Sequence, residues 1–302
     1  MTTLAPGYSR PALRRPISDG AEREISRTCP GATVASWPAK GAVHPYWGPF
    51  QNVYTGHATD EEVRFAGSSG GVISALLIYA LDIGLIDRVL HVGADPDQPT
   101  RNRTVVSRNR LSILQNSGSR YTASSPLAAI DVALAQGGSM AVVGKPCDLS
   151  ALRELAKVDA RVDAHVPLML SFFCGGMPSH NGVLRILAKM GVPTAEVRDF
   201  RFRGMGWPGT AAATTQDGRV VEMSYEESWG SFLSKEVQFR CKICPDAVGG
   251  VADIACADAW YGGESGYPKI DERDGRQRGG PPRDDKGRSR QGSQEGIASR
   301  RL

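Results

Sequence analysis

The sequence predicts an α/β fold with a mixed, partly parallel sheet, flanking helices, and disordered segments at both ends. Two stretches, "MAVVGKPCDLSALRELAKV" and "VPLMLSFFCGGMPSHNGVLRILAKMGV", each pass from a short apolar strand through a turn into a helical pattern. Strands that alternate with helices in this way are typical of parallel β-α units. Further along, "VRDFRFRG", "TAAATTQDG" and "RVVEMSY" predict more exposed strands, with a turn at Asp217-Gly218.

The N-terminal segment, residues 1–45, is expected to be a mostly irregular leader. It is rich in Arg, Pro, Ser and Gly and shows no sustained period. We expect order to begin near Tyr46. Soon afterwards Thr59 is a candidate N-cap for a short helix that opens with Asp60, Glu61 and Glu62, because acidic side chains are favoured at that end.

The stretch "GSSGGVISALLIYALDIG" predicts a buried helix. Its apolar residues recur at helical spacing over much of the circumference, and Gly84 is a natural C-terminal stop. After it, "RVLHVGA" and "TVVSR" predict strands, and "PLAAIDVALAQGG" predicts a helix. The apolar positions are Val72, Ile73, Leu76, Leu77, Ala80 and Leu81.

The C-terminal tail, residues 271–302, is predicted to be disordered because it has few apolar residues to bury. It carries nine Arg or Lys and six Asp or Glu, so 9 − 6 = 3 of the formal charge of +4 lies there. The rest of the chain is close to neutral, and its basic residues are not interleaved with aromatic ones. The sequence therefore argues against nucleic-acid binding.

Composition indicates an ordinary soluble globular protein, with 41% hydrophobic and 23% charged residues among 302. That length allows one or two domains. The apolar runs are shorter than the roughly 20 residues that a membrane span needs. The N-terminus has no apolar signal-peptide core. We therefore expect no membrane span and a cytoplasmic location.

Four of the six cysteines occupy positions from which they could meet. Cys147 and Cys174 each follow a predicted parallel strand, and the carboxyl ends of such strands share one edge of the sheet. Cys241 and Cys244, in "CKIC", have the spacing that lets two sulfurs face one metal centre. Together they supply four thiolates, enough for a [4Fe–4S] cluster or a Cys₄ zinc.

Each of these features has a simpler interpretation when it is taken alone. A single buried cysteine usually serves as a small apolar residue, and one CxxC can belong to a zinc site, a cluster or a redox dithiol. Cys256, in "ADIACADAW", is expected to be a packing residue inside a strand. Cys29, in "TCPG", has no cysteine neighbours in the sequence and cannot hold a cluster alone.

Two polar loops could bind an anion or a ring. "GSSGG", residues 67–71, offers backbone donors at the start of the predicted helix, although it follows a short helix and is not a GxGxxG fingerprint. "QNSGSRY", residues 115–121, combines amide, hydroxyl, guanidinium and phenol groups. The simpler interpretations are a glycine turn required by close packing and a solvated loop.

The order of these motifs resembles the coenzyme F420 hydrogenase/dehydrogenase beta-subunit family, which includes the 7-hydroxymethyl chlorophyll a reductases. The resemblance covers about Tyr46 to Trp260 and implies an N-terminal flavin-side domain (46–138) and a C-terminal iron–sulfur-side domain (139–270). The motifs that carry it are "ATDEEVRFAGSSGGVISALLIYALDIGLID", "NSGSRY", "VGKPCDLSAL", "FFCGG", "FRCKICPD" and "ADIACADAW". Of the relatives' upstream ferredoxin-like cysteine segment only "TCPG" is present, and "QRGGPP" departs from their C-terminal pattern.

This resemblance implies FAD and a [4Fe–4S] cluster as cofactors. Carried over residue by residue, the cluster ligands would be Cys147, Cys174, Cys241 and Cys244. The flavin contacts would include Ser69, Gly70, Gly71, Asn116, Ser119, Arg120 and Tyr121, with Lys145 and Asp258 as further candidates. Lys145 and Asp258 could equally be members of surface ion pairs.

The implied activity is electron transfer between FAD, the cluster and coenzyme F420 or another small redox substrate, with a ferredoxin or another redox subunit as a possible partner. Three alternatives stay open: a flavin and iron–sulfur reductase of a different substrate, a non-catalytic Cys₄ zinc module, and a truncated inactive paralogue. No general acid or base is nominated, because cofactors of this kind carry the chemistry themselves. His180 is expected to be a helix-start residue that faces solvent.

Overall fold

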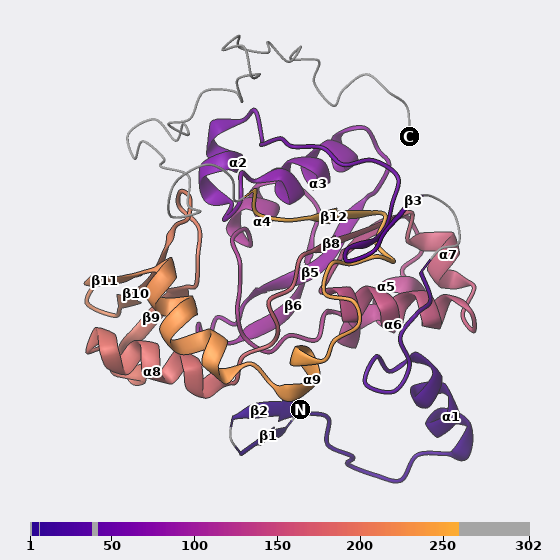
Figure 1. Ribbon diagram of the computed structural model, residues 1–302, viewed down its shortest axis with the longest axis horizontal. Helices are drawn as coiled ribbons and strands as arrows, with labels where there is room; N and C mark the ends of the chain where they lie inside the picture. Colours follow the sequence, from indigo (N-terminus) through magenta and orange to yellow (C-terminus); the bar gives the residue numbers. More distant parts are fainter. Residues whose placement is uncertain (1, 6, 38–41, 260–302) are drawn as a thin grey trace. The chain divides into compact units, whose positions relative to one another are not determined.

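A five-stranded mixed sheet forms the centre of the fold (Figure 1). The computed structural model describes residues 2–5, 7–37 and 42–259. The strand order is β12-β8-β7-β5-β6, in which β12, β8, β7 and β5 are parallel and β6 is antiparallel to β5. The predicted mixed, partly parallel sheet is thereby confirmed. The strands are β5 (Arg88–Ala94), β6 (Asn102–Ser107), β7 (Met140–Val143), β8 (Leu168–Phe172) and β12 (Ile254–Cys256).

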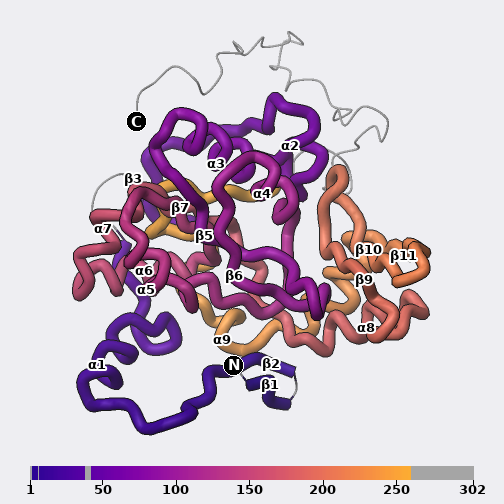
Figure 2. Tube along the Cα trace, turned by 180° about the vertical axis from the view of Figure 1, so that it is seen from behind, coloured from indigo at the N-terminus to yellow at the C-terminus, as the bar shows by residue number. Residues whose placement is uncertain are grey.

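Helices cover both faces of this sheet because its inner strands are apolar on both sides. One face, which includes Val89 and Ala141, packs on α3 (Val72–Asp82). The other, which includes Leu90 and Val142, packs on α5 (Ile130–Ala135), α6 (Pro146–Ala156) and α7 (Arg161–His165). Figures 1 and 2 show the two groups of helices on opposite sides of the strands. The alternation follows from the two-residue repeat of a strand.

The segment before β5 contains α2 (Glu61–Ala66) and α3, as the sequence predicts. The N-cap of α2 is Asp60 rather than Thr59, because the Asp60 carboxylate accepts the Val63 N–H at 3.1 Å. In α3 only Leu77 and Ala80 are fully buried, so this helix is less enclosed than its apolar sequence predicts. The remaining elements of this half are α4 (Arg110–Gln115) and η1 (Pro126–Ala129).

A second, antiparallel sheet follows α8 (His180–Met190). Its strands pack against α8 and η4 around an apolar core that contains Phe200 and Phe202. Gly218 has φ +88° between β10 and β11, which confirms the predicted turn. The elements are η2 (Thr194–Glu196), β9 (Val197–Arg201), β10 (Thr210–Thr215), β11 (Val220–Ser224), the π-helix η3 (Glu226–Phe232), η4 (Leu233–Glu236) and α9 (Phe239–Lys242).

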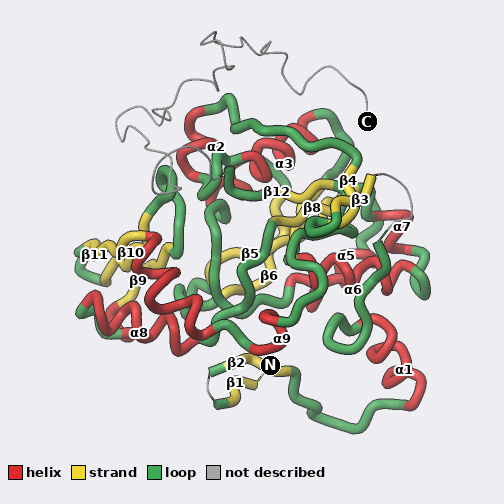
Figure 3. The backbone as a smooth tube through the Cα atoms, viewed as in Figure 1, coloured by secondary structure: helices red, strands yellow, loops and turns green. Residues whose placement is uncertain are grey.

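The N-terminal leader contains more regular structure than its composition predicts, although loops join its short elements (Figure 3). Order begins well before Tyr46, since Ala35 is buried and its N–H donates to Ser150 Oγ on α6 at 2.7 Å. Backbone pairing accounts for the short strands, whereas α1 carries local signals: Ser18 Oγ accepts the Ala21 N–H as an N-cap, and acidic residues stand in the first turn. The elements of the leader are β1 (Thr2–Leu4), β2 (Tyr8–Arg10), α1 (Asp19–Thr28) and β3 (Ala42–His44); β4 (Gly48–Phe50), which pairs with β3, follows the leader.

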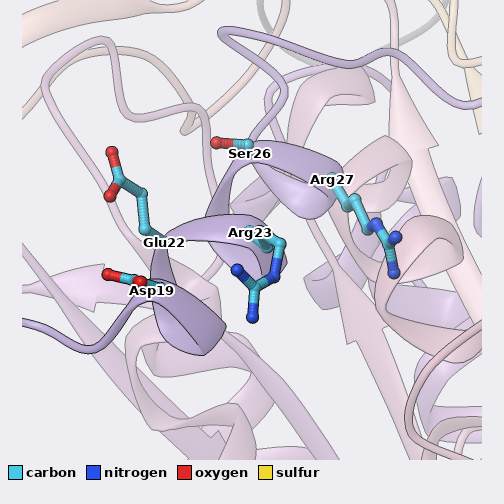
Figure 4. A pocket seen from close by; sticks show the side chains of 5 residues that line it. All are labelled: Asp19, Glu22, Arg23, Ser26 and Arg27. Carbon is cyan, nitrogen blue, oxygen red and sulfur yellow. The ribbon is translucent and has the colours of Figure 1, made fainter.

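Helix α1 buries none of its residues. It carries a surface hollow that contains none of the candidate site residues, lined by Asp19, Glu22, Arg23, Ser26 and Arg27 (Figure 4). The predicted disordered tail, residues 271–302, lies outside the described residues. Within the described part of the chain, no helix is long and apolar enough to cross a bilayer.

Candidate functional site

The structure places Cys147 and Cys174 at the carboxyl edge of the central sheet, and α9, which carries Cys241, lies against the loop that follows Cys174. Cys147 lies in the first turn of α6 after β7, and Cys174 follows the neighbouring strand β8. Burial raises the pKa of Cys147 to about 12, and the nearby Cys174 and Cys241 add to the rise. Burial also raises the pKa of Cys174, with contributions from Cys241 and Cys244. These electrostatic interactions link Cys147 to Cys174 and Cys241, and Cys174 to Cys241 and Cys244.

The glycines of "CGG" make this approach possible. Gly176 has φ +102°, and a Cβ added there would lie 2.5 Å from Val237 Cγ1 and 3.2 Å from Cys241 Cβ. A larger residue would therefore push α9 away from the strand. The same loop directs two backbone donors at sulfur: Gly176 N lies 3.4 Å from Cys174 Sγ, and Met177 N lies 3.3 Å from Cys241 Sγ. Such donors favour the thiolate form.

Four thiols supply the ligand chemistry of either a [4Fe–4S] cluster or a single zinc ion. Four sulfurs bound to one zinc at about 2.3 Å would lie only about 3.8 Å apart. Among the described residues, no three His, Cys, Asp or Glu side chains are arranged to hold one metal ion. A [4Fe–4S] cluster is larger and takes four separate thiolate ligands. The cysteine set fits that group.

Lys145 places a cation beside the thiols. Its Nζ lies 2.6 Å from Asp148 Oδ2 and 2.9 Å from Ser124 Oγ. Burial alone would lower the pKa of Lys145, but Asp148 and the thiols Cys147 and Cys174 outweigh it and leave the pKa raised. Lys145 is therefore a member of a largely shielded ion pair beside the cysteines.

The "GSSGG" turn has both a packing role and an open helix end. Gly70 and Gly71 have φ +64° and +68°, and a Cβ on Gly71 would lie 2.4 Å from Val63 O. This turn therefore needs glycine to fold α2 against α3. In addition, α3 begins without a side-chain cap, so its first N–H groups have no side-chain acceptor. Ser69, in the turn that precedes this helix, is half-buried.

The "QNSGSRY" loop lies against this turn. Ser119 Oγ is 2.6 Å from Ser68 Oγ, which joins two loops that are 51 positions apart in the sequence. Gly118 has φ +90°, and a Cβ there would lie 2.7 Å from Arg203 O. Asn116 Nδ2 donates to Ser112 O at 2.8 Å, so this side chain supports the end of its own helix.

Arg120 holds the loop in place through contacts within the protein. Four of the five N–H donors of its guanidinium are used, one by the side chain of Asn102 and three by backbone oxygens. Burial lowers the pKa of Arg120 to about 10, so it is still a cation at neutral pH. Little of its donor capacity is left for a ligand in this conformation. The three oxygens belong to Pro99, Arg101 and Phe200.

Tyr121 belongs to an aromatic cluster that sequence reasoning missed. Its ring centroid lies 4.9 Å from that of Trp229 and 6.4 Å from that of Tyr225. Phe202 meets the Tyr121 ring edge-on at 6.1 Å. Trp229 lies in η3, Tyr225 directly follows β11 and Phe202 directly follows β9, so all three partners lie more than 80 residues downstream. No short motif signals that contact.

Asp258 closes this cluster through an ion pair with Arg203. Arg203 Nη1 lies 2.7 Å from Asp258 Oδ2, Nη2 lies 3.1 Å from Oδ1, and Trp207 Nε1 lies 3.4 Å from Oδ1. The Arg203 guanidinium also lies 4.4 Å from the Tyr225 ring centroid. Asp258 is thus a member of a largely buried pair. The loop that begins with Arg203, "RGMGWPG", could have been singled out from the sequence, because it contains three closely spaced glycines.

The comparisons with known proteins agree with this architecture. Two models of the family described as "Coenzyme F420 hydrogenase/dehydrogenase, beta subunit" match the chain, the N-terminal model at residues 53–131 and the C-terminal model at residues 137–278. The chain belongs to this family. The match therefore extends past Trp260, where the resemblance in the sequence ended. Membership places the chain among redox enzyme subunits.

Several relatives have named activities. The chain is 26% identical over 219 residues to a coenzyme F420 hydrogenase subunit beta of Methanosarcina barkeri, covering 70% of this chain and 71% of that protein. It is 32% identical over 207 residues to an F420-dependent formate dehydrogenase 1 subunit beta of Methanococcus maripaludis, covering 68% of this chain but only 51% of the relative. A coenzyme F420-dependent sulfite reductase of Methanocaldococcus jannaschii is 26% identical, and the match covers 68% of this chain and 32% of that protein.

Among solved structures, the F420-reducing [NiFe] hydrogenase complex from Methanosarcina barkeri contains a similar chain. The two chains superpose with a TM-score of 0.51 at 25% identity, covering 65% of this chain and 66% of that one. The α/β fold of this beta-subunit family member is thus shared with a hydrogenase component.

The other singled-out residues lie outside this constellation or at its margin. His180 starts α8, but it does not face solvent as expected: Thr100 Oγ1 lies 3.1 Å from its Nε2, and burial lowers its pKa to about 4. Cys256 ends β12, and burial raises its pKa to about 11. Cys29 is exposed at the end of α1, in a loop whose Pro30 O accepts a hydrogen bond from Arg240 of α9.

Proposed function

We propose that this beta-subunit family member is a flavin- and iron–sulfur-dependent oxidoreductase subunit. It would pass electrons between FAD, a [4Fe–4S] cluster and coenzyme F420 or a similar small redox substrate. The observation that supports the proposal is that Cys147 and Cys174 follow neighbouring parallel strands, while Cys241, in α9, lies against the loop that follows Cys174.

The cysteine edge has the chemistry that a cluster requires. The four thiols would each bind one iron, and the Gly176 and Met177 N–H groups would stabilise negative charge on sulfur. Lys145 would offset part of the negative charge of the four thiolates. Hydrogen bonds and nearby charge of this kind tune the reduction potential of a cluster.

The two joined loops are proposed to bind FAD. The backbone of Gly70 and Gly71 and the uncapped start of α3 suit a phosphate, and Ser69 and Ser119 add hydroxyl groups. Tyr121 offers a ring face, whereas Asn116, Arg120 and Asp258 act by holding the loops in place. A bound FAD would supply two-electron chemistry at its ring and one-electron exchange with the cluster.

F420 as the substrate and a ferredoxin or another redox subunit as the partner are proposed from the relatives' names and the shared fold. A cytoplasmic location is proposed on the sequence alone. If reduced F420 does not reduce the bound flavin of purified protein and another donor does, the activity is that of a flavin and iron–sulfur reductase with a different substrate.

The test of the cluster is anaerobic purification followed by absorbance and metal analysis. We expect a broad band near about 400 nm and about four irons per chain. Cys147→Ser and Cys244→Ser should each lose the band, whereas Cys29→Ser and Cys256→Ser serve as matched controls that retain it. Colourless protein with stoichiometric zinc would refute the cluster and favour the Cys₄ zinc module.

The test of the flavin is its release from denatured protein and its reconstitution. We expect bound FAD that is lost in Gly70→Val, since that substitution adds bulk at a left-handed position on the helix approach. Protein that releases no flavin and retains none of the FAD added to it would refute the flavin part of the proposal.

A further inference from the structure

Trp229 lies between the two halves of the candidate site. Its ring centroid is 4.9 Å from that of Tyr121, with the two planes tilted by 51°. On the other side, a Cβ added to Gly175 would lie 2.7 Å from Trp229 Cζ2 and 3.0 Å from Cη2. Gly175 directly follows Cys174. One indole ring therefore touches the loop proposed for FAD and the loop that carries a proposed cluster ligand.

The surroundings hold this ring in one place. Trp229 is half-buried and packs on the apolar core formed by α8 and the antiparallel sheet. It lies in η3, a π-helix, a rare conformation that is frequent at functional sites. The φ angle of Gly175 is not in the positive range that favours glycine. Glycine at this position is therefore explained by the contact with the indole ring and not by the backbone.

We propose that Trp229 is a positioning residue that couples FAD binding at the Tyr121 loop to the cluster at the Cys174 loop. The proposal rests on the proposed function. Because both loops contact the same fixed ring, a cofactor that orders one loop also orders the other. Such coupling is reciprocal: the factor by which the cluster tightens FAD binding equals the factor by which FAD stabilises the cluster-bound state.

The test compares the affinity for FAD with and without the cluster. The dissociation constant is measured anaerobically by quenching of flavin fluorescence, first on iron-loaded protein and then on the same protein after iron removal with a chelator. We expect the iron-loaded wild-type protein to bind FAD at least about fivefold more tightly, the lower end of typical coupling. A second readout is the rate of iron release to the chelator, which bound FAD should slow.

Two variants remove the ring contact by different routes. Trp229→Leu deletes the indole, and Gly175→Ala displaces it through the close contact with Cζ2. Each should bring the affinity ratio close to one and abolish the effect of FAD on iron release, while Trp229→Phe should keep part of both. Phe232→Leu is the matched control, because Phe232 lies in the same helix and packs on the same core; it should leave the ratio unchanged.

The two proposals fail in distinguishable ways. If wild-type protein binds no FAD or no iron, the proposed function is refuted. If wild-type protein binds both but its affinity for FAD does not depend on the cluster, the role of Trp229 is refuted. That role is also refuted if Trp229→Leu and Gly175→Ala both keep the wild-type ratio.

Discussion

Removal of the Asp258 carboxylate tests whether the ion pair with Arg203 holds the aromatic cluster together. The Arg203 side chain is 3% exposed and that of Asp258 is 16% exposed, so the pair is largely shielded from water. Asp258→Ala leaves the guanidinium charge without its bidentate carboxylate. Breaking a buried pair from one side typically costs about 3–5 kcal/mol.

Two contacts that Arg203 keeps reduce the expected loss in the free energy of unfolding. After the substitution, Arg203 keeps its hydrogen bond to Pro208 O at 2.6 Å and its position over the Tyr225 ring. We therefore expect a loss of about 2–4 kcal/mol in the free energy of unfolding. With a urea dependence of about 2–3 kcal/mol per molar, the midpoint should fall by about 1 M.

The assay is urea unfolding of cofactor-free protein, because bound ligands would add their own stabilisation. Asp131→Ala is the matched control: Asp131 pairs with Arg161 at 2.8 Å, but its side chain is 81% exposed. Such an exposed pair should contribute only about 0–1 kcal/mol. If Asp258→Ala lowers the midpoint no more than Asp131→Ala, the reasoning about the buried pair is wrong.

Three further outcomes are expected. Gly176→Ala should lower both the free energy of unfolding and the iron content. Gly218→Ala is the control, since Gly218 also has a positive φ but nothing lies within 4 Å of the added Cβ; it should cost only about 1 kcal/mol and leave the iron content unchanged. Equal effects of the two variants on iron would contradict the role given to the "CGG" loop. Lys145→Gln should make the midpoint potential of the proposed [4Fe–4S] cluster more negative in redox titration, because a nearby positive charge favours the reduced form. An unchanged potential would argue that Lys145 acts only through Asp148. His91, buried with its Nε2 2.8 Å from Ser107 Oγ, has a pKa that burial lowers to about 4. The unfolded chain therefore binds a proton first, so stability should fall as the pH drops from about 6.5 towards 4, and His91→Leu should reduce that slope in urea titrations at several pH values.

The elements of the fold were predictable because their signals are local. The apolar strands β5, β7 and β8, the helices α6 and α8, and the turn at Gly218 each depend on residues close in sequence, and all were found where expected. The positions of Cys147 and Cys174 at one edge also followed from the sequence, because parallel neighbouring strands bring their carboxyl ends together.

Only the tertiary structure decided which side chains surround that edge. Trp229 meets Tyr121, and Asp258 meets Arg203, across 108 and 55 positions of the chain, so no spacing rule could pair them. Likewise Arg120 has the chemistry of an anion ligand in the sequence, but in the fold three of its donors go to backbone oxygens and one to the Asn102 side chain. Residue type states what a side chain can bind, whereas long-range packing determines which of those bonds are already made.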